Sequence, residues 1–215
     1  PRPAPARLMA DLPASLRLAE GCRRCPALVA NRSRIVHGYG PPPPGDGAAV
    51  LFVGEAPGAR GGDVTGVPFT GDRSGVRLQQ VLIRLGLSAE TDPRVRAPRL
   101  RCFVTNVVRC NPPGNRAPTR AEIENCLPYL WQEIDLWQPR IVVPVGNIAA
   151  QAIVPRLTGR PAPPIGRCQA QVLGSRPLVV PMRHPARSPN ADLDRFVAVM
   201  QELLRQPAGT GARSS

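Results

Sequence analysis

Lysine is absent from this chain of 215 residues, and all 28 of its basic residues are arginines. Only 15 residues are acidic, so the formal net charge is +13 at pH 7. A coding bias explains the choice of arginine over lysine, but it does not explain the excess of basic over acidic residues. So strong a positive charge favours a polyanionic partner, and nucleic acid is the first candidate.

Long apolar runs are also missing. No stretch of about 18 apolar residues is present, so we expect no membrane-spanning helix. The first residues do not combine a charged segment with an apolar one, so no secretion signal is expected and the cytoplasm is the expected compartment. With 42% hydrophobic residues, the length suits one globular domain with a buried core.

The pattern along the chain predicts one α/β domain. Segments 1–10 and 206–215 lack apolar periodicity and are expected to be disordered, which leaves a single domain at 11–205. Continuously apolar, β-rich runs alternate with helical patterns, which predicts a parallel sheet covered by helices on both faces. The expected strands are 49–53, 102–108, 141–145 and 178–182. The expected helices are 76–85, 119–137 (with a capping box at Thr119 and a kink or break at Pro128), 147–153 and 191–205.

Unusual residues lie near the end of each of the four expected strands or shortly after it. They are residues 54–58 (Gly-Glu-Ala-Pro-Gly), then Asn106 and Cys110, then Gly146-Asn147, and finally His184-Pro185. Ligands of open α/β sheets bind beyond the carboxyl ends of the strands, so we expect these residues to meet at one crevice. Chance placement of turn residues is the alternative, because every α/β protein has loops at this edge.

Four of the six cysteines have the spacing of metal ligands. Cys22 and Cys25 form a CxxC pair in a polar, arginine-containing segment, and Cys110 and Cys126 lie at the two ends of a turn-plus-helix segment. Four thiolates can hold either a zinc ion or a [4Fe–4S] cluster. Buried free cysteines are the alternative, and we accept it for the other two, Cys102 and Cys168.

Two glycine-rich turns, at residues 54–58 and 66–75, enclose Phe69. Glycine lets the backbone approach a ligand closely. A phosphate-binding P-loop is not supported, because no Gly-Lys-Ser/Thr follows. A phenylalanine is more often a core residue than a stacking platform, but the position of Phe69 in a polar loop favours stacking.

These motifs resemble, in their order along the chain, those of the iron–sulfur uracil-DNA glycosylases, families 4 and 5 of their superfamily. The resemblance runs from Cys22 to about Leu203, and its motifs are residues 54–58, 68–75, 105–116, Cys126 and 184–185. Residues 54–58 and 105–106 match family 4, whereas residues 70–75 are closer to family 5. This mixture leaves the substrate range open between uracil alone and further deaminated bases.

The resemblance implies a three-layer αβα sandwich with a four-stranded parallel sheet. It also implies a DNA-repair glycosylase that hydrolyses the N-glycosidic bond of uracil in DNA and leaves an abasic site. Of the two metal sites that the spacing allows, it implies the [4Fe–4S] cluster, with the ligands Cys22, Cys25, Cys110 and Cys126. A monomer acting on uracil-containing DNA is the expected working form.

A base inside a duplex must be flipped into a pocket before it can be cut out. We expect Gly54 and Ala56 to line this pocket and Phe69 to stack on the base. Asn106 can read the edge of uracil, donating to O4 and accepting from N3–H, and His184 can stabilise the leaving anion by donating to O2. The alternatives are a strand-end turn residue at Asn106 and a packed strand-end histidine at His184.

A carboxylate must orient the attacking water. Asp72 is the first candidate by its match to family 5, and Glu55 is the second by its match to family 4. Either residue could instead cap a helix, and Asp72 stands at a suitable distance before one. The predicted catalytic residues are therefore Asp72, Glu55 and His184, whereas His37 is expected to be structural or exposed.

The segment after His184-Pro185 is a candidate DNA contact. In the wider superfamily this loop enters the minor groove, so Arg187 is either a wedge or a phosphate contact, with Ser188 and Arg73 as further DNA-binding candidates.

Two other functions compete with this interpretation of the sequence. A non-catalytic iron–sulfur nucleic-acid-binding module has no need for the pocket residues together. An enzyme of free nucleotides would need a phosphate-binding lysine or a ribose-binding acidic residue, and neither is found.

Overall fold

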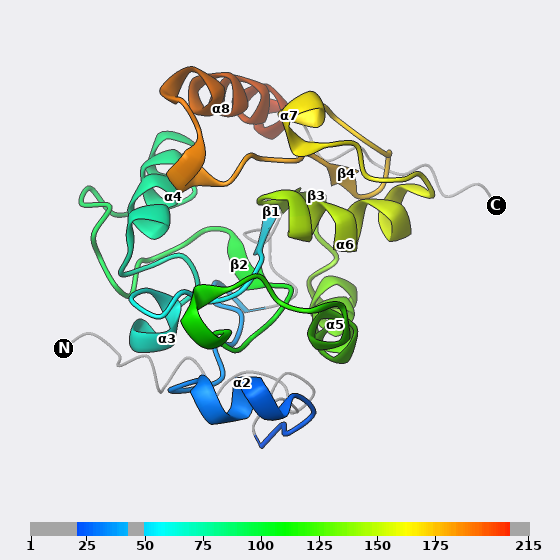
Figure 1. The fold of residues 1–215 in the computed structure, drawn as a ribbon. Helices are drawn as coiled ribbons and strands as arrows, with labels where there is room; N and C mark the ends of the chain where they lie inside the picture. The colour runs from blue at the N-terminus through cyan, green and yellow to red at the C-terminus, as the bar shows by residue number, and fades with distance from the viewer. Residues whose placement is uncertain (1–20, 43–49, 207–215) are drawn as a thin grey trace.

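The computed structural model describes residues 21–42 and 50–206 (Figure 1). The expected disordered segments at 1–10 and 206–215 lie outside these residues, apart from Gln206. At the centre is a parallel sheet with the strand order β2-β1-β3-β4. The strands are β1 (Val50–Gly54), β2 (Phe103–Asn106), β3 (Ile141–Pro144) and β4 (Leu178–Val179). The predicted α/β fold with a four-stranded parallel sheet is therefore confirmed.

The second and fourth strands are shorter than their apolar runs. After β2, the backbone N–H groups of Val107 and Val108 donate to the carbonyls of Gly54 and Glu55, so this buried segment pairs with the last residue of β1 and the residue after it. After β4, the amides of Val180 and Met182 still bond to β3 residues, but Pro181 between them has no N–H to donate. Both runs are thus buried, as expected, apart from the half-buried Leu178, although the regular ladder ends earlier.

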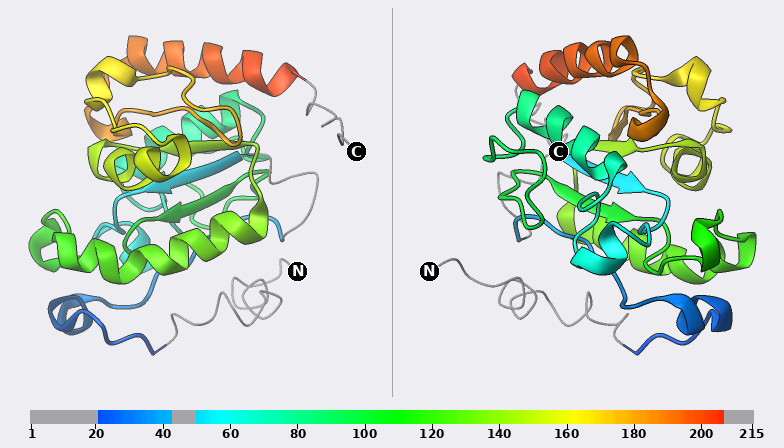
Figure 2. Two further views of the ribbon diagram at one scale, coloured as in Figure 1. Left: turned by 90° about the vertical axis from the view of Figure 1, so that its right-hand side faces the viewer. Right: turned by 60° about the vertical axis from the view of Figure 1, so that its left-hand side comes forward.

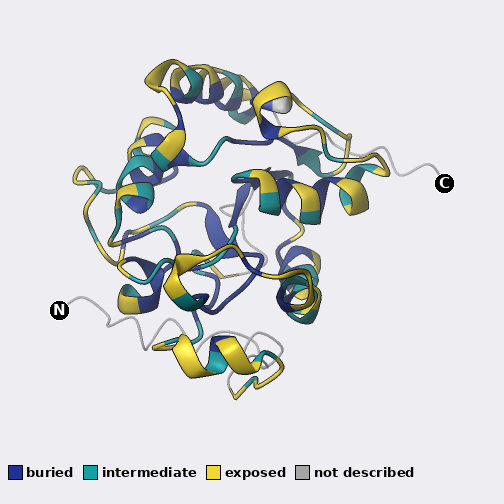
Figure 3. Ribbon diagram, viewed as in Figure 1, coloured by how far each residue is buried: buried dark blue, intermediate teal, exposed yellow. Residues whose placement is uncertain are grey.

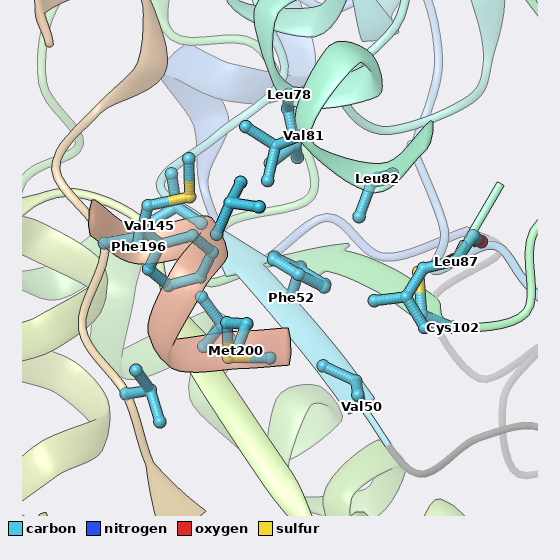
Figure 4. Packing of buried hydrophobic residues seen from close by; sticks show 14 of the residues in the cluster. Val50, Phe52, Leu78, Val81, Leu82, Leu87, Cys102, Val145, Phe196 and Met200 are labelled. Carbon is cyan, nitrogen blue, oxygen red and sulfur yellow. Dashed lines mark hydrogen bonds between the residues drawn. The ribbon is translucent and has the colours of Figure 1, made fainter. Parts of the chain in front are cut away.

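Helices cover the sheet on both faces, which makes three layers (Figures 1 and 2). The alternation of side chains along β1 shows this directly: Val50 and Phe52 pack toward α4 (Arg73–Arg84) and α8 (Asn190–Arg205), as Figure 4 shows. Leu51 and Val53 pack instead toward α5 (Arg120–Trp137) and α6 (Asn147–Thr158). Figure 3 shows the consequence, with the strands buried and the helices exposed on their outer sides.

The long helices begin where the sequence provides caps. Asp72 caps α4 by accepting from the Gly75 amide, and Thr119 and Glu122 form the expected capping box of α5. Of the kink or break predicted at Pro128, the break does not occur: α5 continues through this residue. A proline inside a helix costs about 3 kcal/mol, and the buried face of α5, which packs on the sheet, offsets this cost.

The remaining helices are short. They are α2 (Pro26–Asn31), α3 (Gly62–Thr65), α7 (Ile165–Cys168) and the 3₁₀ turns η2 (Pro113–Asn115) and η3 (Pro185–Arg187). None of the helices within the described residues is long and apolar enough to cross a membrane. The chain leaves β1 toward β2 on one side and returns to β3 on the other, so the strand order reverses between β1 and β3. Ligands bind at such switch points, outside the carboxyl ends of the strands.

Candidate active site

A pocket of about 850 Å³ lies at the carboxyl ends of the strands. Residues that follow all four strands line this pocket, as expected from their positions in the sequence. Of the residues singled out in the sequence, the lining includes Gly54, Glu55, Ala56, Phe69, Asp72, Asn106, His184 and Arg187. Arg73 and Ser188 do not line the pocket, and the four spaced cysteines lie elsewhere.

Asn106, Phe69 and Gly54 are packed tightly together. Asn106, the last residue of β2, is buried, and its Nδ2 atom has no hydrogen-bond partner among the described residues. A Cβ atom on Gly54 would collide with the Asn106 Oδ1 atom and with the Phe69 ring, so only glycine fits between them. Phe69 has a φ of 56°, which is rare for a residue with a side chain and is typical of strained functional sites.

His184 faces the same pocket from the end of the fourth strand. It is half-buried, its Nδ1 atom has no partner among residues 21–42 and 50–206, and its ring lies beside Gly146. Burial lowers the pKa of His184, and the charge of Arg187 lowers it further, while Asp72 acts in the opposite direction. The imidazole is therefore neutral at pH 7, a form in which one nitrogen donates and the other accepts.

The two candidate carboxylates differ in their surroundings. The Asp72 Oδ1 atom accepts from the Gly75 amide at 2.8 Å, while Oδ2 lies against Gly58 and Gly61, whose missing side chains leave room for it. The capping role considered for Asp72 is thus present, together with its place in the pocket wall. Glu55 is half-buried; burial raises its pKa, and the charge of Arg187 opposes this effect.

Two asparagines that the sequence analysis missed hold the loop after β1. The Asn111 Nδ2 atom donates to the Pro57 carbonyl and to the Asn115 Oδ1 atom, both at 2.8 Å. The same Asn115 oxygen accepts from the Ala59 amide at 2.8 Å. Asn115 has a φ of 55° within a Pro-Pro-Gly-Asn turn, so the available signals were this turn chemistry and the place of both asparagines in the 105–116 motif.

The four spaced cysteines gather on the face of the sheet that α5 covers. Cys22 and Cys25 precede α2, Cys110 follows β2, and Cys126 lies in α5. Cys110 lies within electrostatic range of Cys22 and Cys25, and Cys126 within range of Cys110 and Cys25. No set of three or more His, Cys, Asp or Glu side chains in the described part of the chain is close enough to hold a single metal ion.

Hydrogen-bond donors point at these sulfur atoms. The Arg32 guanidinium donates to the Cys110 Sγ atom at 3.1 Å and to the Cys22 carbonyl at 2.9 Å. The Asn125 amide donates to the Cys25 Sγ atom at 3.5 Å, and the Arg109 backbone N–H bonds to the Cys126 thiol. Donors of this kind stabilise thiolates, which are the form that binds iron.

Cys102 and His37 are buried and do not line the pocket. Cys102 is fully buried in the core, where burial raises the pKa of its thiol, which agrees with the expected free cysteine. The side chain of Cys168 lies outside the described part of the structure. His37 is buried, and burial together with the charge of Arg109 lowers its pKa to about 4, so the imidazole is neutral at pH 7.

Fold and pocket together define an α/β protein with a pocket lined by polar side chains at the switch point of a parallel sheet. Residues 42–205 match the family model described as uracil DNA glycosylase superfamily, and the chain belongs to this family. The type-4 uracil-DNA glycosylase of Pyrobaculum aerophilum is 39% identical over 82% of this chain and 83% of its own length. The type-5 uracil-DNA glycosylase of Thermus thermophilus is 33% identical over 94% of this chain and 90% of its own. The predicted resemblance to families 4 and 5 is confirmed.

Proposed function

We propose that this protein is a DNA-repair glycosylase that removes uracil from DNA and leaves an abasic site. The observation that carries the proposal is the buried Asn106 amide, whose nitrogen lacks a partner among the described residues and which lines the pocket. An unpaired buried donor costs about 1–3 kcal/mol, so the site favours a ligand that supplies an acceptor. The O4 atom of a flipped uracil is such an acceptor.

The pocket supports a division of roles around the base. Phe69 would stack on the ring, with Gly54 and Ala56 forming the adjoining backbone wall. As the C1′–N1 bond breaks, its electron pair leaves with the base, and a hydrogen bond from neutral His184 to O2 would stabilise that charge. Water then adds its hydroxyl group to C1′ and releases a proton. The match of residues 70–75 to family 5 supports a range that extends to other deaminated bases.

Asp72 or Glu55 would orient this water, since both carboxylates line the pocket. Its raised pKa makes the Glu55 carboxylate a stronger proton acceptor than an ordinary glutamate. The same shift reduces the fraction of Glu55 that is ionised in mild acid. We retain Asp72 as the first candidate, because its fixed position at the start of α4 suits an orienting group.

We further propose that Cys22, Cys25, Cys110 and Cys126 hold a [4Fe–4S] cluster. Such a cluster would be held by four cysteine thiolates, each binding a different iron, so it does not require the four side chains to converge on one ion. Two observations support four thiolate ligands here. The thiols lie close enough to interact electrostatically, and N–H groups donate to their sulfur atoms. When bound, the cluster would tie α2, the segment after β2 and α5 together.

The cluster proposal predicts a brown protein with iron in excess of zinc. Cys110→Ser should remove the colour and also lower the stability, because the metal site joins separate segments. Cys102→Ser is the matched control and should keep the colour, since Cys102 lies in the core. A colourless, zinc-loaded wild-type protein that still excises uracil would contradict the proposal.

DNA contacts are proposed at Arg187, Ser188 and Arg73. Arg187 and Arg73 are exposed, whereas Ser188 is buried and its hydroxyl donates to the His184 carbonyl at 3.1 Å. Ser188 would therefore act by holding the loop that contacts DNA.

We also propose that the chain is a monomer with one domain at 11–205. Light scattering during chromatography tests the oligomeric state.

One assay tests the whole proposal. Full-length protein in excess is mixed with an oligonucleotide that carries a single uracil, and free base and abasic strand are measured over a single turnover. We expect both products to appear in equal amounts. A protein that binds the oligonucleotide but releases no base would instead support the non-catalytic module.

A further inference from the structure

We infer that Arg77 is a positioning residue that holds the His184 loop in place against α4, an inference that rests on the proposed function. Arg77 does not line the pocket. Its guanidinium donates to the Ser188 carbonyl at 2.8 Å through Nη1 and to the Asn190 Oδ1 atom at 2.7 Å through Nη2. Two bonds from one planar group fix both the distance and the orientation of what they hold.

These bonds act on the segment that carries His184. The Ser188 side chain is buried, and its hydroxyl donates to the His184 carbonyl at 3.1 Å. The Arg187 backbone N–H donates to the same carbonyl at 3.0 Å. Residues 184–188 thus form a hydrogen-bonded turn that begins at His184, and Arg77 binds its last residue, Ser188. A displacement of Ser188 would therefore also displace His184.

The other end of this connection is Asp72. Asp72 caps α4, and Arg77 lies five residues further on in the same helix, about 7 Å along its axis at a rise of about 1.5 Å per residue. Figure 1 shows the segment before α8 passing beside α4. The helix is thus a rigid connection between the carboxylate of the pocket and the loop that carries its histidine. Through Arg77 it fixes the spacing of two groups that the reaction needs.

The same pair of helices offers a matched control. Arg84 in α4 forms an ion pair with Asp194 in α8 at 2.8 Å, and both side chains are about half exposed. Arg84 lies seven residues beyond Arg77, about 10 Å further along the helix. Its removal takes away an arginine and an α4–α8 contact, as removal of Arg77 does, but it leaves the turn at His184 unchanged.

The kinetic test compares Arg77→Ala with Arg84→Ala in the full chain. A displacement of about 1 Å in an active site can lower a rate on the order of 10²-fold. We expect Arg77→Ala to lower the single-turnover rate of uracil release about 10–100-fold on single-stranded and duplex DNA alike, with less than about threefold change in the Kd for DNA. Arg84→Ala should stay within about twofold of the wild-type rate. Asn190→Ala, which removes one of the two acceptors, should give an intermediate loss.

A second readout needs no substrate. The chain has two histidines, so the imidazole NMR signals form two sets, which His37→Gln assigns. We expect Arg77→Ala to shift and broaden the His184 set only, and Arg84→Ala to change neither. If the wild-type protein released no uracil, the proposed function would fail while this spectrum still tested the connection.

Two outcomes overturn the inference. One is a wild-type rate together with unchanged His184 signals in Arg77→Ala. The other is an equal loss in Arg77→Ala and Arg84→Ala, which would reduce the effect to general α4–α8 stability. If Arg77→Ala does not fold, Arg77→Lys and Asn190→Ala decide, because each keeps one of the two hydrogen bonds and should show the smaller loss.

Discussion

At the scale of single residues, Asn106 is the sharpest test of what the pocket reads. Asn106→Asp replaces the donor that faces O4 with an acceptor, and a mismatched buried pair costs about 1–3 kcal/mol. We expect uracil release to slow about 10–100-fold, since 1.4 kcal/mol corresponds to a factor of about ten. Excision of cytosine from a matched oligonucleotide is measured alongside, and we expect the ratio of the cytosine rate to the uracil rate to rise in the variant.

Asn147→Asp separates the loss of a donor from the gain of a negative charge. Asn147 also lines the pocket, but its Oδ1 atom accepts from the Ile165 amide, a role that aspartate retains. We expect a smaller loss for Asn147→Asp than for Asn106→Asp. Equal losses in both variants would show that charge alone is responsible and that Asn106 does not read the base.

The two carboxylates are compared through Asp72→Asn and Glu55→Gln. Asparagine caps helices about as well as aspartate, so Asp72→Asn removes the charge and leaves the start of α4 stable. A group that activates water contributes roughly 10²–10⁴-fold, and we expect the larger loss of single-turnover rate at Asp72. A larger loss at Glu55 would assign the water to the glutamate, and equal melting temperatures would exclude unfolding as the cause.

The residues of the site divide into those that the sequence could indicate and those that it could not. Asn106 lies near the end of one apolar run and His184 two residues after another, so strand topology alone predicted that they meet. Asn111 acts on Pro57, which lies 54 positions away in the chain, and Arg77 acts on Ser188, 111 positions away. No local pattern encodes such contacts, because they depend on how the finished layers pack.

At the scale of elements, the start of α5 should respond to pH. Bidentate bonds from Arg116, together with the capping bonds to Thr119, lower the pKa of Glu122 to about 2. A lowered folded-state pKa stabilises the fold above the ordinary value of 4.5, and this gain is lost as the pH falls toward 2. We expect Glu122→Gln to be less stable than the wild type at pH 7, with the difference shrinking between pH 4.5 and 2.

Urea unfolding at pH 7, 4.5 and 2.5 measures this difference. Glu124→Gln is the matched control, because Glu124 pairs with Arg120 on the same helix at 2.7 Å but both side chains are exposed. Exposed pairs contribute about 0–1 kcal/mol, so this variant should change little at any pH. If the difference in free energy of unfolding between Glu122→Gln and the wild type stays constant with pH, ionisation of Glu122 does not stabilise the cap.

The elements themselves were predictable where local signals and packing agree. Caps at Asp72 and Thr119 and continuously apolar strands gave the order and type of the main elements. Of the kink or break predicted at Pro128, the break was wrong, because the rule counts the lost hydrogen bond and ignores the buried face of α5 that lies on the sheet. Beyond β4 the amides of Val180 and Met182 still bond to β3, so the apolar run at 178–182 follows the sheet further than the regular strand does.

At the scale of the whole molecule, the net charge of +13 has to act through particular arginines, and Arg187 distinguishes two ways of doing so. As a phosphate contact, its loss in Arg187→Ala should weaken binding to all DNA and lower the salt slope by about one. As a wedge, its loss should slow excision from duplex far more than from single strands, because only the duplex must be held open.

The position of Arg187 adds a requirement to this experiment. Its charge lowers the pKa of both His184 and Glu55, so Arg187→Ala should raise both pKa values. The acid limb of the pH–rate profile should then move toward neutral pH. The comparison of duplex with single strands therefore belongs on the upper plateau of that profile, where both groups keep their working forms. Arg120→Ala removes the same charge from an exposed site outside the pocket and should leave the duplex-to-single-strand ratio unchanged. A ratio that is also unchanged in Arg187→Ala would exclude the wedge and leave Arg187 with two electrostatic roles, toward phosphate and toward the pocket.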